Sequence, residues 1–145
     1  MKKQFAKLNS EEISLLLKAP ILVSVLASSS DHEINNDGKA EAIRLAHLKT
    51  FTADPLLLSY YEEVSKNFQK HFEETAKKYS PFDKVKIGDL KKEIDKVNDV
   101  IAKLDTEFAQ TLHHSLSEYA RHVKKAGRSL LDDFIFPIPI RGLTD

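Results

Sequence analysis

The stretch Pro20-Ile21-Leu22-Val23-Ser24-Val25-Leu26-Ala27 decides the fold, because it is apolar on every side. A segment of this kind is either a buried strand or a buried helix. Proline suits the first turn of a helix, where no backbone N–H is needed, and the neighbouring segments have helical patterns. We therefore predict a central helix here, enclosed by the other elements of the fold.

Five further helices are predicted around this segment, from apolar residues at helical spacing and from residues that start or stop helices. The first begins at Asn9, whose side chain can cap free backbone N–H groups while Glu12 reaches back to Asn9. It ends near Lys18, because Pro20 disfavours a helical conformation in the residue before it. The other four run from about Lys39 to Lys49, from Asp54-Pro55 to Tyr79, from about Gly88 to Leu104, and from Asp105 or Thr106 to about Lys125.

Two of these helices carry apolar seams that repeat every three or four residues. The seam residues are Leu90, Ile94, Val97, Ile101 and Leu104 in one helix, and Phe108, Leu112, Leu116, Tyr119 and Val123 in the other. A chain of 145 residues is about one domain long. We therefore predict an all-α fold: residues 1–145 form a single-domain bundle of about six helices, with residues 1–8 as a flexible N-terminus.

Residues 128–145 are predicted to form an irregular, extended C-terminal tail. Pro137 and Pro139 lie only two residues apart, which prevents a regular helix. The apolar strip Phe134–Ile140 either packs on the helices of its own chain or contacts a partner. The final Leu143-Thr144-Asp145 resembles the start of a capped helix, so we expect that a longer chain would continue here.

The overall composition argues against several classes of protein. Lys and Arg total 22, and Asp and Glu also total 22, so a nucleic-acid binder, which needs a basic surplus, is not expected. The absence of cysteine excludes disulfides and thiolate zinc sites. No signal peptide and no membrane-spanning segment are visible, so a cytoplasmic location is expected.

The segment from Asp31 to Glu41 is the most acidic part of the chain, with four carboxylates against one lysine. Hard cations such as calcium, magnesium or manganese bind several oxygen ligands on a bent loop. An EF-hand register that begins at Glu33 places Gly38 at its turn, but puts Arg44 where a bidentate Glu is required. The segment is therefore either a divalent-cation site or a solvated turn with a helix cap near Asp37.

The chain resembles the TerB-like (tellurite-resistance TerB) helical domains. The residues Leu8 to Glu12 match the opening capped helix of that family, and Ala27 to Ile34 match a motif in which Asp31 is the acidic residue. His32 stands where the family has glycine. In the second half, Val123 to Gly127 resembles the end of the helix that precedes the second acidic segment.

This resemblance implies an all-helical bundle with two acidic loops close together, linked to stress and tellurite-resistance systems, with divalent-metal binding and without established catalysis. On that basis the metal-binding residues would be Asp31, Glu33, Asp37, Glu41, Asp132 and Asp133, with Asp145 at the end of the second segment. The sequence thus predicts a non-enzymatic TerB-like binding or interaction module with a protein partner.

Two alternatives stay open. A metal-dependent enzyme would use His and Glu ligands on helices, and His114, Glu118 and His122 have a suitable spacing of four. On a helical wheel, however, His114 points away from the apolar stripe, which predicts a solvent-facing set. His71 with Glu74 offers no better site, and His47 is predicted at the edge of the core. The second alternative is a purely structural helical subunit.

Overall fold

The computed structural model describes residues 2–30 and 32–127 of the chain, and within these residues the fold is all-α, as predicted. Two-residue strands form the one small sheet in this part. The elements are α1 (Lys2–Phe5), α2 (Ser10–Leu17), α3 (Ala19–Ser28), β1 (Ser29–Ser30), β2 (Glu33–Ile34), α4 (Asn36–Thr52), the 3-10 helix η1 (Pro55–Leu57), α5 (Leu58–Ser65), α6 (Phe68–Tyr79), α7 (Lys84–Ile101) and α8 (Thr106–Gly127). The predicted tail, including the strip Phe134–Ile140, lies outside the described residues.

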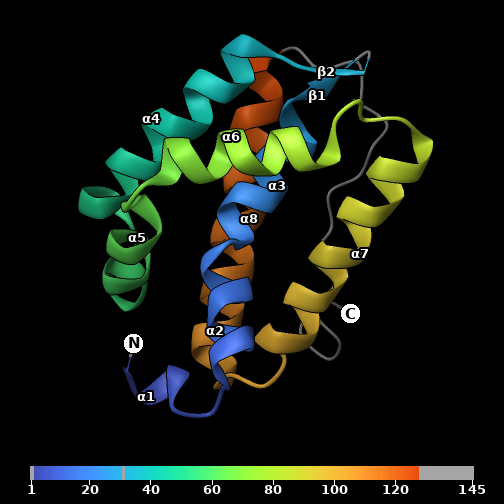
Figure 1. Ribbon diagram of the computed structural model, residues 1–145. Coiled ribbons are helices and arrows are strands. Elements are labelled where there is room, and N and C mark those ends of the chain that lie inside the picture. Colours follow the sequence, from blue (N-terminus) through green and yellow to red (C-terminus); the bar gives the residue numbers. More distant parts are fainter. Residues whose placement is uncertain (1, 31, 128–145) are drawn as a thin grey trace.

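The central helix is α3, and every one of its residues is buried. It packs most extensively on α8, and α4, α6 and α7 cover its other sides (Figure 1). This confirms the prediction drawn from the stretch 20–27. Because α3 is apolar on all sides, neighbours are needed in every direction to remove its surface from water.

The helix starts predicted for α2 and α8 and the apolar seams predicted for α7 and α8 are also confirmed. At the start of α2, the Glu12 backbone N–H donates to Asn9 Oδ1 at 2.8 Å, and the Asn9 N–H donates to Glu12 Oε1 at 3.0 Å. All ten predicted seam residues are buried, although Leu104 lies just after α7, which ends at Ile101. The helix α7 begins at Lys84 rather than near Gly88, because Asp83 caps it.

The single long helix predicted from Asp54 to Tyr79 is wrong. The structure divides this stretch into η1, α5 and α6, with Asn67 in a left-handed conformation (φ 58°) at the second break. Asparagine tolerates this region better than most residues. Val64 and Phe68 are buried on either side of the break, which is why their spacing of four resembled a continuous helix. The break lets α5 pack on α4 while α6 crosses over α3 (Figure 1).

The N-terminal residues contact the rest of the bundle. Phe5 in α1 is buried, and Gln4 and Lys7 bind the carboxylate of Asp105, at the start of α8. Lys103 forms a further ion pair with Glu12. The segment 1–8, which is predicted to be a flexible N-terminus, therefore includes the short helix α1, and its residues have defined partners. Among the helices of the described part, none combines the length and the hydropathy that a membrane span requires.

Three buried tyrosines join helices that are distant in sequence. Tyr60 donates to the Leu16 carbonyl of α2 at 2.7 Å, and Tyr119 donates to the Ala42 carbonyl of α4. The hydroxyl groups of Tyr61 and Ser115 are hydrogen bonded at 2.5 Å, which links α5 to α8. The Tyr61 and Tyr119 rings are stacked with their centroids 6.3 Å apart. Each of these three phenols thus has a hydrogen-bond partner, as burial requires.

The Tyr61–Ser115 pair generates a test by mutation. Ser115→Ala leaves the buried Tyr61 hydroxyl without a partner and should lower the free energy of unfolding by about 1–3 kcal/mol. Tyr61→Phe should cost less, because the Ser115 hydroxyl can turn to a carbonyl of its own helix. Urea unfolding of both single variants and the double variant measures the coupling. Strict additivity of the two effects would contradict a direct bond.

Candidate functional site

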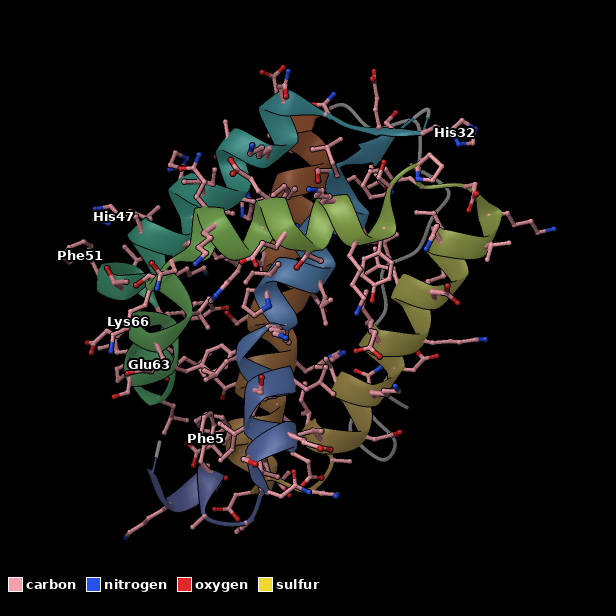
Figure 2. All side chains as sticks on the ribbon, viewed as in Figure 1. Phe5, His32, His47, Phe51, Glu63 and Lys66 are labelled. Carbon is pink, nitrogen blue, oxygen red and sulfur yellow. The ribbon has the colours of Figure 1, made fainter. Side chains whose placement is uncertain are left out.

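The predicted acidic loop forms a small hairpin between α3 and α4. The strands β1 and β2 pair antiparallel, with Ser29 opposite Ile34 and Ser30 opposite Glu33. His32 lies in the turn with φ 67°, and its side chain points away from the helices (Figure 2). The hairpin therefore replaces most of the open loop that the sequence predicted, and α4 begins three residues earlier than expected.

Asn35 anchors this hairpin to two helices at once. Its Oδ1 accepts from the Gly38 N–H at 3.0 Å, which caps α4, and its Nδ2 donates to the Gly127 carbonyl at 2.8 Å, at the end of α8. The helix cap is thus Asn35, two residues before Asp37. Gly38 also has a packing role: a Cβ atom there would lie only 2.9 Å from the Ser28 Cβ. The glycine that the EF-hand register assigned to a turn is required for close contact between α3 and α4.

The predicted metal residues have separate surroundings. Glu33 and Asp37 are exposed. Glu41 binds the Arg44 guanidinium through two hydrogen bonds of 2.6 and 2.8 Å, and these bonds lower the pKa of Glu41. Asp31, Asp132 and Asp133 lie outside the described residues. Across residues 2–30 and 32–127, no group of three His, Asp or Glu side chains is arranged to hold a metal ion.

The histidine set on α8 faces solvent, in agreement with the helical wheel. His114 and His122 are exposed. His122 Nε2 lies 3.8 Å from Glu118, which is also paired with Arg121. His47 differs from the prediction, since its side chain is exposed instead of lying at the edge of the core.

Sequence reasoning missed a surface at the C-terminal end of α4. Phe51 is 71% exposed, and Leu48 and Leu56 are 37% and 39% exposed. The His47 and Phe51 rings meet edge to face with centroids 5.4 Å apart, and both side chains project from the end of α4 (Figure 2). Phe51 lies beyond the predicted helix end at Lys49, so no pattern had placed it on a helix face. We call His47, Leu48, Phe51 and Leu56 the α4 corner.

A groove of about 440 Å³ adjoins the α4 corner. Its walls come from α4 and from the junction of α5 and α6, and His47 lines it on the side towards Phe51. The lining residues are Ile43, Ala46, His47, Ser65, Asn67, Phe68, Gln69 and Lys70. The break at Asn67 therefore shapes one wall of this groove.

Comparisons with known proteins leave the family open. No family model matches the chain, and neither curated proteins nor solved structures gave a match. The resemblance to TerB-like domains therefore stays a prediction.

The two bonds of Asn35 can be tested against its neighbour. Asn35→Ala removes a helix cap and a hydrogen bond to α8, each worth about 1 kcal/mol, so the free energy of unfolding should fall by about 1–2 kcal/mol. Asn36→Ala is the matched control, because Asn36 is exposed and lies outside both bonds. Denaturant unfolding compares them, and equal stability of the two variants would contradict the anchoring role of Asn35.

The predicted cation site is tested by thermal melts in EDTA, calcium, magnesium and manganese. An ion at 100 times its Kd should stabilise the fold by about 2.7 kcal/mol. The stabilisation should disappear in an Asp31→Asn/Asp37→Asn variant. A stabilisation that survives this double substitution would contradict the loop assignment, and the absence of any shift would contradict cation binding altogether.

Proposed function

We propose that this chain is a non-enzymatic helical binding module that docks on a protein partner through the α4 corner. The observation that carries the proposal is the exposure of Phe51, at 71%, with two further exposed leucines, Leu48 and Leu56, within five residues of it in the sequence. Burying a phenylalanine side chain contributes about 1.5–3 kcal/mol relative to leaving it in water. A partner that covers Phe51 would gain this contribution without reorganising the helix that carries the ring.

The clustering of apolar side chains supports this choice of surface. Single exposed apolar residues are normal, whereas a group of them marks an interaction site. The described residues include four large apolar side chains that are exposed, and three of them lie between residues 48 and 56. The fourth, Val85, stands alone at the start of α7.

The adjoining groove supplies the second feature of a binding surface. Interface energy is concentrated in a few aromatic or other large side chains beside well-packed pockets. At the α4 corner, Phe51 would enter a pocket of the partner, while a side chain of the partner would enter the groove next to His47. The proposal of a binding module does not depend on the cation site or on the TerB-like resemblance, which remain separate proposals.

The test is site-specific photo-crosslinking in cells that produce the protein, with a benzophenone amino acid at position 51 or at position 85. Val85 is the matched control, because it is 70% exposed and is also apolar. We expect a protein that crosslinks from position 51 and not from position 85. Calorimetry with that purified partner should give a Kd at least tenfold higher for Phe51→Ser, which is a loss of about 1.4 kcal/mol, and an unchanged Kd for Val85→Ser.

Two results would contradict the proposal. One is that positions 51 and 85 crosslink to the same proteins. The other is a partner that binds Phe51→Ser as tightly as the unchanged chain. Thermal melts of both serine variants verify that the fold is intact, as expected for exposed positions.

A further inference from the structure

A second surface lies on another side of α6. Three hollows of about 260, 320 and 330 Å³ follow one another along this helix. The first and second share Lys18 and His71, and the second and third share Lys78, Tyr79 and Glu93. The three hollows therefore lie in a row from the break at Asn67 to α7, and we call this row the α6 groove. Figure 1 shows α6 crossing α3 towards α7 along this path.

The floor of the α6 groove consists of side chains that belong to the packed core. Ile21 and Leu22 of α3, Val64 of α5 and Tyr79 of α6 line it, and all four are buried in the core. A ligand in the groove would therefore meet the exposed edges of packed core side chains, which do not need to reorganise on binding.

The rim of the groove is charged, with a surplus of lysines. Lys66 is paired with Glu63 and Lys96 with Glu93, each at 2.9 Å, so these four charges balance one another. Figure 2 shows Glu63 and Lys66 together beside α5. The rim residues outside these pairs are four lysines and two acids: Lys18, Lys78, Lys86, Lys92, Glu74 and Asp89.

These four lysines are not neutralised by an ion pair with an acidic residue of the described chain. Lys78 lies over the Tyr79 ring, 5.4 Å from its centroid. Lys18, Lys86 and Lys92 form no ion pair with the acidic residues of the described chain. A ligand carboxylate would therefore not have to displace an existing partner.

We propose that the α6 groove binds an acidic, apolar peptide segment of a protein partner. Carboxylates of the segment would pair with Lys18, Lys86 and Lys92, and its apolar side chains would lie on the floor. The 12 residues of α6 span about 18 Å, and an extended peptide of about six residues has the same length. This site is separate from the α4 corner and goes beyond the proposed function.

The mixed charge of the rim favours a peptide over a polyphosphate or a nucleic acid. Glu74 and Asp89 would repel a densely charged phosphate chain, and such a chain has no apolar side chains for the floor. A peptide that alternates acidic and apolar residues fits both features. Its binding should weaken as the salt concentration rises, because the rim is exposed to solvent.

The experiment measures binding of fluorescent ten-residue peptides to the full chain by fluorescence polarisation. The probes alternate Asp or Glu with Leu or Phe, and the reference peptides carry Gln or Lys in place of the acids. We expect binding only with the acidic probes. Lys86→Glu/Lys92→Glu should raise Kd at least tenfold, while Lys3→Glu/Lys125→Glu, which changes the net charge equally outside the groove, should change Kd less than twofold.

A gain of affinity provides an independent check. Glu74→Lys adds a positive charge to the rim and should lower Kd at least threefold. Phe51→Ser should leave peptide binding unchanged, so failure of this proposal is distinguishable from failure of the α4 corner as an interaction surface.

Several outcomes would overturn the inference. The first is that the acidic probes do not bind at millimolar concentration. The second is that both double variants lose the same amount of affinity for the probes. The third is that inorganic polyphosphate, or vesicles containing phosphatidylserine, bind more tightly than the acidic probes. Sedimentation of the unchanged chain tests one more outcome, which is self-association through the groove. A dimer that Lys86→Glu/Lys92→Glu dissociates would assign the groove to a second copy of the chain instead of a peptide.

Discussion

The enclosure of α3 is the constraint on which the rest of the bundle depends. This helix has no polar face to turn towards solvent, so α8, α4, α6 and α7 must all reach it. Hydrogen bonds along the helix pair its inner backbone groups, the Ser28 hydroxyl donates to the Ser24 carbonyl, and the Ser28 carbonyl at the end of the helix accepts from the Asn35 N–H at 2.7 Å. The apolar area removed from water is therefore not offset by unpaired backbone groups. The hairpin, the break at Asn67 and the short 3-10 turn before α5 are among the places where the chain changes direction to build this enclosure.

The parts of the fold that the sequence predicted are those set by local chemistry. The capping pair of Asn9 and Glu12, the buried seams of α7 and α8, and the apolar run of α3 all depend on residues a few positions apart. The break at Asn67 escaped prediction because the apolar spacing from Val64 to Phe68 is the same in a continuous and in a broken helix. Only the requirement that α6 cover α3 decides between them, and that requirement is tertiary.

The candidate sites follow the same division. The acidic character of residues 31–41 was visible, but the hydrogen bond from Asn35 to Gly127 joins residues 92 positions apart and has no local signal. The EF-hand register explains Gly38 by a sharp turn, whereas in the structure a side chain at this position would collide with Ser28 of α3. Phe51 was missed because α4 extends past its predicted end. The α6 groove combines residues of α2, α3, α5, α6 and α7, so no single stretch of sequence contains it.

The buried tyrosines have an optical consequence. The chain has four tyrosines and no tryptophan, and all four phenol side chains are buried. Burial raises the pKa of each of them above the usual value of about 10, so the unfolded chain loses these protons first as the pH rises. Stability is therefore unaffected by these groups below that pH and decreases above it. Phenolate absorbance in alkaline solution then appears together with unfolding, and it reports opening of the core without any added label.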